Sequence, residues 1–417
     1  MIRRLVSLLH RDYWLIPSLG TVLAAFLLAL SPPATFAPAP AADFPEVPPG
    51  LTPVTRYPPI DGYEVENVVF MIGDGLGFNE IALARIRAGL YDTGLHMEQF
   101  PVLGLQKNRT IDGLLTRSGA AGTALAAGIK TRNNFIGMLP TGETVISLLE
   151  AAHFHGMKTG IVVTSSVTHA TPAAFYAHIH DRHLQDTIAF DLARVSPDVI
   201  LGGGRAYLLP SGRLDGRRTD GIDFAKRFAA AGYRVLLDPR DWSRADRLPL
   251  LGLFAEDGLT TLPPEPSLAE MTARALALLN RSGSRFFLMV EGSQIDWAGH
   301  RNDEEYLVRQ VLLFDEAVDQ AARFAARDRR TLVIVTADHE TGGLALLEKE
   351  SDPDDARAAW TTRDHTIAPV PIFAYGPGAE RFSGLLDNTE IAREIARLLG
   401  GSVEPKRGIT TLLFESG

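Results

Sequence analysis

The chain contains no cysteine among its 417 residues. It therefore forms no disulfide, and it offers neither a thiolate ligand for a metal ion nor a cysteine nucleophile. A lipid anchor attached through cysteine is excluded as well. The cellular compartment stays open, because exported and intracellular proteins can both lack cysteine.

Basic residues do not gather into a stripe along the sequence, and the formal net charge is -9. Proteins that bind nucleic acid present a clustered positive surface, so we expect no nucleic-acid-binding surface here. The negative charge does not exclude a phosphate-bearing small molecule, because a few bound metal ions can reverse the local sign of the charge.

Long hydrophobic runs are missing from the sequence except near its N-terminus. Arg3, Arg4 and Arg11 precede the uncharged stretch 13–30, and a tail of small residues and proline follows it. This pattern is typical of an export signal, so we expect residues 1–42 to be a signal peptide or a membrane anchor. The stretch is close to the shortest length that spans a membrane, which leaves both alternatives open. We expect an exported protein that is periplasmic, secreted or anchored on the outer side.

The remaining chain has the composition of a globular enzyme, with 46% hydrophobic and 22% charged residues. Residues 43–63 are rich in proline and predict an extended linker. Residues 64–417 are long enough to bury a large core, and we expect them to form one catalytic domain. We find no internal repeat in them.

Short apolar runs alternate with amphipathic segments in this part of the chain. The expected strands are 68–72, 159–164, 198–201, 286–290, 332–336 and 370–374. They are β-branched or aromatic and apolar on both faces, as in a parallel sheet that helices cover on both sides. We therefore predict an α/β fold, a three-layer α/β/α sandwich around a large, mostly parallel sheet.

Two helices can be placed with more detail. Ser267 and Glu270 form a capping box at the start of one helix. Apolar residues from Leu307 to Ala321 repeat at helical spacing, which predicts a helix face packed on the core. Residues 205–265 interrupt this rhythm with arginine, aspartate and proline. We expect them to form an insertion over the active-site face.

Acidic residues follow three of the expected strands. Asp74, Glu291 and Asp338 come just after the first, fourth and fifth of the apolar runs. Ligands in such sheets bind beyond the carboxyl ends of the strands, where these three carboxylates are expected to meet. Placing several buried carboxylates together without neutralising partners is costly, so bound cations are the expected solution.

Three histidines extend this set of donors. Asp296 and His300 are four residues apart, so a helix would point both side chains the same way and let them chelate one ion. His339 follows Asp338 directly, and His365 stands in a polar segment. Taken singly, these residues can also be a surface pair, a polar strand end and an exposed loop residue.

Four further residues have both a structural and a chemical interpretation. Ser118 begins a run of small residues and can be a helix cap or a nucleophile in the positive potential of a helix start. His169 and Thr171 follow the second strand, and the hydroxyl of Thr171 can cap a helix or bind a metal ion. Arg182 can be a surface arginine or a clamp for phosphate.

Seven fragments of the sequence occur together and span roughly residues 65–400. They are Gly73-Asp-Gly-Leu-Gly77, Thr116 to Ala124, His169 to Ala174, Ile200 to Gly204, Glu291 to His300, Thr336 to Gly343, and His365. In this order they resemble the alkaline phosphatase family. The resemblance implies an α/β/α core, a homodimer and a crown segment outside the core, which residues 205–265 would form.

The resemblance also implies two zinc ions and one magnesium ion. The first zinc would be held by Asp296, His300 and His365. The second, which also activates the nucleophile Ser118, would be held by Asp74, Asp338 and His339. The third ion, usually magnesium, would be held by Asp74, Thr171 and Glu291, with His169 beside them. Arg182 would bind the phosphate.

Two positions depart from the pattern of many family members. Arg117 stands where many members carry aspartate beside the nucleophile, which puts the usual orientation of the phosphate-binding arginine in doubt. His169 takes a position that is aspartate in some members, so zinc can compete with magnesium at the third site. Trp297 replaces a basic residue found in some members, but other bacterial members resemble this chain there.

The resemblance implies hydrolysis of phosphate monoesters to an alcohol and inorganic phosphate through a phosphoserine on Ser118. Related metal enzymes that cleave phosphodiesters or phosphonates are the main alternative, although they often use threonine as nucleophile. A sulfatase fits less well, because the chain has no cysteine and no serine modification motif around Ser118. A phosphate-binding protein without activity is the alternative from another class.

Overall fold

The structure is a computed structural model that describes residues 57–406 and 409–414. The expected signal or anchor, residues 1–42, and residues 43–56 of the expected linker lie outside the described residues. A search of the described helices for one with the length and hydropathy of a membrane span finds none.

The strands and helices alternate along the chain as predicted. The strands are β1 (Asn67–Gly73), β2 (Val102–Lys107), β3 (Lys158–Ser166), β4 (Val199–Gly203), β5 (Arg234–Leu236), β6 (Leu250–Leu253), β7 (Phe286–Gly292), β8 (Thr331–Thr336), β9 (Leu344–Glu348), β10 (Ala356–Trp360), β11 (Val370–Tyr375), β12 (Gly384–Asp387), β13 (Gly401–Lys406) and β14 (Ile409–Phe414). The α-helices are α2 (Phe78–Arg87), α3 (Ser118–Ala127), α4 (Leu148–Phe154), α5 (Ala170–Ala173), α6 (Gln185–Val195), α7 (Arg205–Leu208), α8 (Phe224–Ala230), α9 (Leu268–Arg281), α10 (Gln294–Arg301), α11 (Glu304–Asp328) and α12 (Asn388–Leu398). Short 3-10 helices are η2 (Met97–Gln99), η3 (Pro239–Arg244) and η4 (Ala379–Phe382).

Ten strands of the described residues form one sheet in the order β12-β2-β11-β8-β1-β7-β3-β4-β6-β5. All neighbouring pairs are parallel except those of β11, which runs antiparallel to both β8 and β2. The smaller pairs β9–β10 and β13–β14 are antiparallel. The prediction of a mostly parallel sheet is therefore confirmed.

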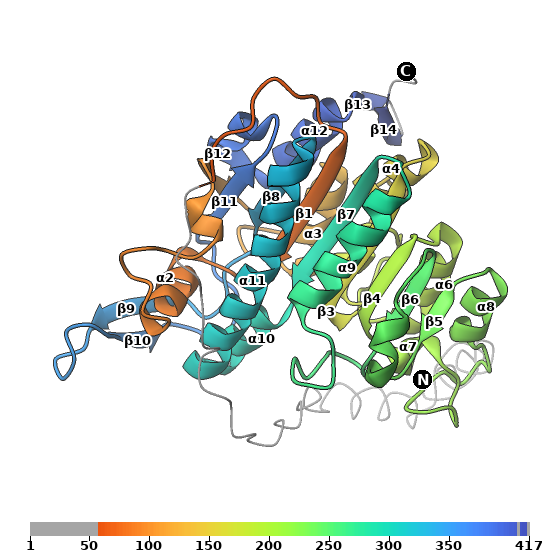
Figure 1. Cartoon of the computed structure of the whole chain (residues 1–417), viewed down its shortest axis with the longest axis horizontal. Helices are drawn as coiled ribbons and strands as arrows, with labels where there is room; N and C mark the ends of the chain where they lie inside the picture. Colours follow the sequence, from red (N-terminus) through yellow and green to blue (C-terminus); the bar gives the residue numbers. More distant parts are fainter. Residues whose placement is uncertain (1–56, 407–408, 415–417) are drawn as a thin grey trace, which may run out of the picture. The chain divides into compact units, whose positions relative to one another are not determined.

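Helices cover both faces of this sheet. On one face α9 and α11 pack against the central strands β1, β3, β7 and β8, and Figure 1 shows both helices in front of these strands. On the other face Phe70 and Ile72 of β1 share a buried core with Leu149 of α4 and Ile391 of α12. The two faces use alternate residues of each strand, which explains why the strands are apolar throughout. The three-layer α/β/α sandwich is confirmed.

The two helices placed from the sequence form as expected. Ser267 caps α9 by accepting the backbone N–H of Glu270, and the carboxylate of Glu270 accepts the N–H of Ser267. The apolar stripe from Leu307 to Ala321 lies on α11, where its members are fully buried. This stripe is therefore core packing, as predicted.

Residues 205–265 differ from the expected insertion over the active-site face. They contain β5 and β6, which continue the main sheet beyond β4 as its outermost parallel strands. The expectation was wrong for these strands, because polar connections surround two short strands. β6 is apolar and fully buried, whereas β5 buries only Leu236. The segment thus belongs in part to the sheet.

Candidate metal centre

Three of the predicted acidic residues meet because their strands are neighbours. β1 lies between β8 and β7, and Ile72 of β1 pairs with Thr336 on one side and Glu291 on the other. Asp74 directly follows β1, and Asp338 is the second residue after the end of β8. Since parallel strands end at the same edge of the sheet, the three carboxylates reach one place, and all three side chains are fully buried.

The reversed direction of β11 explains how His365 reaches the same place. The segment that precedes β11 lies at the carboxyl ends of the other strands, because β11 runs antiparallel to β8. His365 forms an isolated bridge with Thr341 there, and its ring Nδ1 lies 2.9 Å from the carbonyl oxygen of Thr116. Its exposed fraction is 6%, so the alternative of an exposed loop residue is wrong.

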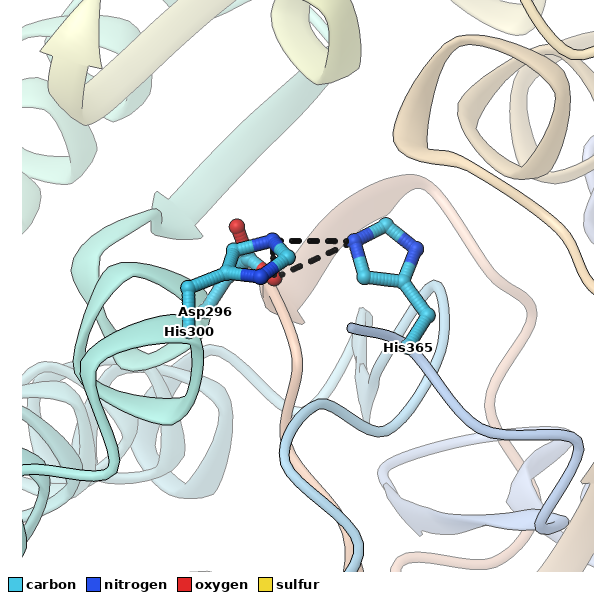
Figure 2. Close-up of side chains that lie close together, drawn as sticks. All are labelled: Asp296, His300 and His365. Atoms are coloured by element: carbon cyan, nitrogen blue, oxygen red, sulfur yellow. Dashed lines mark hydrogen bonds and ion pairs between the residues drawn. The ribbon is translucent and has the colours of Figure 1, made fainter. Parts of the chain in front are cut away.

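The helix α10 directly follows β7 and presents Asp296 and His300 on one side, as their spacing predicts. Nε2 of His300 lies 3.3 Å from Oδ1 of Asp296. Nε2 of His365 lies 3.5 Å from the same oxygen and 3.2 Å from Nε2 of His300. Figure 2 shows the ring of His365 reaching toward the other two side chains from the opposite loop.

These separations match a shared ion. Zinc binds oxygen and nitrogen donors at about 2.0–2.1 Å, so two donors of a tetrahedral site lie about 3.3–3.4 Å apart. The three distances among Asp296, His300 and His365 fall between 3.2 and 3.5 Å. One carboxylate and two imidazoles are a donor set that suits zinc and leaves a position for another ligand.

A second group consists of Asp74, Asp338 and His339. Nε2 of His339 lies 3.1 Å from Oδ2 of Asp338 and 3.6 Å from Oδ1 of Asp74. Both of these carboxylate oxygens are buried without a hydrogen-bond partner in the structure. Unpartnered buried carboxylates are rare in proteins, so this group also fits a cation with mixed nitrogen and oxygen ligands.

A third group brings Asp74, His169 and Glu291 close enough to hold one ion. Both carboxylate oxygens of Glu291 and Nδ1 of His169 are buried without a hydrogen-bond partner. The hydroxyl of Thr171 lies 3.4 Å from Oδ2 of Asp74. Oxygen donors suit magnesium, whereas the imidazole of His169 also suits zinc.

Thr171 does not cap a helix, so that interpretation was wrong. It lies inside the short helix α5, whose N-cap is His169 and whose third residue is Pro172. Proline is most common at the first position of a helix, but Pro172 is the third residue of α5, so the helix begins before Thr171. As a result the side chain of Thr171 turns toward Asp74 and away from the free N–H groups of α5.

Ser118 is not a cap either. It is the first residue of α3, the N-cap is Arg117, and no side chain caps this helix start. The Oγ atom of Ser118 lies 3.4 Å from Nε2 of His339, within the second group of donors. The hydroxyl thus stands between the positive end of a helix and a candidate metal site, where an alkoxide is favoured.

Arg182 lies beside the same donors. One of its terminal nitrogens, Nη2, is 3.2 Å from Nε2 of His169. Its backbone N–H donates to the carbonyl oxygen of Asn134, which ties it to the segment that follows α3. The rings of Trp297 and His169 meet edge to face, with 6.4 Å between their centroids. The guanidinium of Arg182 therefore lies beside His169 of the third group of donors.

Burial dominates the electrostatics of the carboxyl groups. It raises the pKa of Glu291 to about 8, and together with neighbouring carboxylates it raises the pKa of Asp74 well above its usual range. Burial also acts to raise the pKa of Asp296, but His365 and His300 outweigh it and hold that pKa below its usual range. The protein alone therefore does not neutralise all of these acids.

Burial, assisted by the charge of Arg182, lowers the pKa of His169 to about 3. Burial likewise lowers the pKa of His339. Both imidazoles are therefore neutral at neutral pH, and only a neutral imidazole has a free lone pair for a metal ion.

Several supporting residues were not singled out from the sequence. The hydroxyl of Thr341 donates to Oδ1 of Asp296 at 2.6 Å and lies 3.2 Å from Nδ1 of His339. Gly75 has a positive φ of 79°, and a side chain there would strike Asp296 and Thr341. Glu340 accepts the N–H of Gly343 at 2.7 Å and so fixes the loop after His339. In the sequence, Glu340 and Thr341 were marked only by their place in the fragment Thr336 to Gly343, which resembles the alkaline phosphatase family.

Comparison with known proteins agrees with this geometry. The family model described as alkaline phosphatase matches residues 65–351 and 346–400. Alkaline phosphatase 4 of Bacillus subtilis is 34% identical over 427 residues, which cover 81% of this chain and 90% of the relative. These matches extend over most of the described residues.

Solved structures show the same relationship. The alkaline phosphatase of the Antarctic bacterium TAB5 is 36% identical, has a TM-score of 0.73, and is matched over 81% of this chain and 98% of its own. A histidine-to-aspartate variant of that enzyme, 34% identical with a TM-score of 0.71 over the same shares of both chains, has magnesium bound in its M3 site. The chain described here belongs to the alkaline phosphatase family of metal-dependent enzymes.

Proposed function

We propose that this enzyme hydrolyses phosphate monoesters through a phosphoserine on Ser118, at a site that holds two zinc ions and one magnesium ion. The observation that carries the proposal is the position of the Ser118 hydroxyl, 3.4 Å from His339 and beside three adjoining groups of metal donors. Phosphoryl transfer needs a positioned nucleophile and concentrated positive charge, and this arrangement supplies both.

The donor sets support an assignment of residues to ions. We assign the first zinc to Asp296, His300 and His365, and the second to Asp74, Asp338 and His339. We assign magnesium to Asp74, Thr171 and Glu291, with His169 as a further donor that also admits zinc. When bound, such ions withdraw charge from phosphate oxygens and lower the pKa of attached groups, which is the chemistry that the site requires.

The side chains of the protein then have defined tasks. Ser118, at the start of α3, attacks phosphorus, and the helix start favours the ionised oxygen. Arg182 donates hydrogen bonds to oxygens of the transferred group and holds it in line. Because Ser118 lies beside the second group, the leaving oxygen of an in-line displacement lies toward the first group, near His300 and His365. Release of free phosphate follows when water attacks the phosphoserine from that same side.

The charges agree with a dianionic substrate. Asp74, Glu291, Asp296 and Asp338 supply four negative charges when ionised, and three divalent cations supply six positive charges. Arg182 adds one more. The centre is therefore positive although the whole chain carries a net charge of -9.

The relative rates on two substrates test the proposed reaction against its main alternative. An aryl phosphate monoester is expected to be hydrolysed far faster than the diester with the same leaving group. The reason is that a diester offers one negative charge fewer to Arg182 and to the cations. A diester hydrolysed as fast as the monoester would show that the enzyme is a phosphodiesterase.

Replacing Arg182 with alanine is expected to lower kcat/KM for the monoester by roughly 10- to 150-fold. This range corresponds to about 1.5–3 kcal/mol for hydrogen bonds to a charged group. The rate on the diester is expected to fall less. A lysine at this position should restore only part of the loss, because it lacks the fork geometry of arginine. Equal losses on both substrates would contradict a role in binding the phosphate dianion.

In the metal-free protein, the free energy of unfolding is expected to fall as the pH rises from the unfolded pKa of the Asp74 and Glu291 carboxyls, about 4, toward the folded pKa of Glu291, about 8. Burial raises the pKa of Glu291 to about 8 and that of Asp74 well above its usual range, whereas both are near 4 in an unfolded chain. Their stabilising contribution is complete below the unfolded pKa and disappears as the pH rises through the folded pKa. Each proton adds a slope of about 1.4 kcal/mol per pH unit.

Urea unfolding of the metal-free protein between about pH 7 and 8 measures this slope, because Glu291 is protonated there only in the folded state. The metal-loaded protein is the control, since its ligating carboxylates are ionised in both the folded and unfolded states. Above about pH 7 the histidines with lowered pKa, His169 and His339, are neutral in both states and add no slope. Identical slopes with and without metal would count against these carboxyls as the ligands.

The resemblance to alkaline phosphatases and the N-terminal sequence extend the proposal to the whole protein. We propose that it is exported, to the periplasm, the medium or the outer side of a membrane, and that it acts as a homodimer. The basic, apolar and alanine-rich parts of residues 1–42 support export. N-terminal sequencing of the mature protein distinguishes a signal peptide, which is cleaved, from a membrane anchor, which is retained.

A further inference from the structure

An ion pair stands at the rim of the site, outside the residues assigned above. Nη2 of Arg117 lies 3.3 Å from Oδ2 of Asp364. The exposed fractions of the two side chains are 42% and 47%, so both reach solvent. Most of the metal donors are buried, and Arg182 is half-buried beside them. Arg117 and Asp364 are therefore charged groups that can meet the part of a substrate outside the buried centre.

Their places in the chain fix where this pair lies. Arg117 is the N-cap of α3 and directly precedes Ser118. Asp364 directly precedes His365, and its Oδ1 atom accepts the backbone N–H of His365 at 2.9 Å. The pair thus links the nucleophile to the first group of metal donors. In the proposed reaction, this is the side on which the leaving group departs.

The two side chains are held to different degrees. Asp364 is fixed by its bond to the backbone, and the carbonyl oxygen of the same residue accepts the N–H of Gly342 at 3.0 Å. For the guanidinium of Arg117, Asp364 is the one hydrogen-bond partner among the described residues. An arginine has five N–H donors, so most of those of Arg117 are free for another anion.

The electrostatic environment favours an anion over a cation at this rim. Burial lowers the pKa of Arg182, and the nearby positive charge of Arg117 adds to this lowering. The start of α3 adds partial positive charge. Exposed ion pairs contribute little to stability, so Arg117 can exchange part of its contact with Asp364 for a substrate anion at small cost.

We propose that Arg117 selects phosphate monoesters whose leaving group carries a negative charge of its own, with Asp364 holding the arginine at the mouth of the site. The proposal rests on the proposed function and names a class of substrate for it. Suitable esters are phosphorylated hydroxy acids and other polyanionic monoesters. Arg117 is a specificity-determining residue in this view, and the transferred phosphoryl group stays with Arg182 and the metal donors.

Three alkyl monoesters that differ in leaving-group charge test the proposal. Phosphoglycerate has an anionic leaving group, glycerol phosphate a neutral one and phosphocholine a cationic one. The metal-loaded enzyme is expected to have its highest kcat/KM on phosphoglycerate and its lowest on phosphocholine. Replacing Arg117 with alanine should lower the ratio of phosphoglycerate to glycerol phosphate by about fivefold, the size of an exposed ion pair.

Two variants separate charge from structure. Arg117→Lys keeps the charge and should retain most of the preference. Asp364→Asn removes the competing carboxylate and should raise the ratio above that of the unchanged enzyme. Salt at about 0.5 M should reduce the differences among all variants, because exposed charges are screened.

A binding measurement gives a second readout that does not depend on turnover. In a Ser118→Ala background, calorimetry with phosphoglycerate and glycerol phosphate should show the same preference, and Arg117→Ala should remove it. A ratio that Arg117→Ala changes less than about twofold, or a preference for phosphocholine, would overturn the inference. Failure to hydrolyse any of the three esters would instead overturn the proposed function.

Discussion

Replacing Ser118 with alanine is expected to reduce monoester hydrolysis by at least roughly a thousandfold. Loss of the nucleophile costs about 10⁶-fold in a serine protease, and part of the rate remains because the rest of the site still acts. Here Arg182 and the metal donors stay in place, so some attack by water should continue. The side chain of Ser118 is 2% exposed and lies at the start of α3, where loss of one oxygen leaves little empty space.

The same variant should retain its metal ions, because the ligand groups do not include the serine oxygen. Rapid acid quenching with a radioactive monoester should label the unchanged enzyme at Ser118 and leave the variant unlabelled. Ser211→Ala, an exposed serine in the segment after α7, is a matched control and should behave like the unchanged enzyme. A Ser118→Ala enzyme with undiminished turnover would refute the nucleophile assignment.

Chelation of the metal ions is expected to abolish activity and to lower the free energy of unfolding by several kcal/mol. One occupied site adds about 2.7 kcal/mol when the free ion is present at 100 times its Kd. Three sites share a small volume here, and Asp74 contributes to two of the donor groups. Once the ions leave, the buried oxygens of Asp74, Glu291 and Asp338 that lack hydrogen-bond partners also lose their neutralising charge.

Addition of zinc and magnesium should restore both activity and stability. Calcium is a suitable control, because it prefers six to eight oxygen ligands and the first two groups contain imidazoles. Chelator saturated with zinc beforehand should have no effect, which excludes direct action of the chelator on the protein. An unchanged urea midpoint after complete metal removal would mean that the acids are not held by ions.

The sequence was sufficient for the features that depend on short-range patterns. The apolar runs of β1, β7 and β8 predict buried parallel strands because both faces of each strand are covered by helices. From that arrangement, the meeting of Asp74, Glu291 and Asp338 follows directly, because parallel strands end at one edge. The four-residue spacing of Asp296 and His300 correctly predicted that both side chains lie on one side of a helix.

Other features depend on contacts that no local pattern records. His365 reaches the centre because β11 runs antiparallel to β8, and the direction of a strand cannot be read from its residues. Thr171 faces Asp74 because the N-cap of α5 is His169, two residues earlier than Pro172 suggested. β5 and β6 were missed because they are short, and Arg234–Leu236 alone is too brief to separate from a loop.

Elemental analysis of the enzyme, purified without chelator and supplied with zinc and magnesium, tests the metal centre most directly. The assignment of Asp74, Glu291, Asp338 and the three histidines His300, His339 and His365 to three ions predicts about two zinc and one magnesium per chain. Fewer than two divalent ions per chain in active enzyme would contradict it.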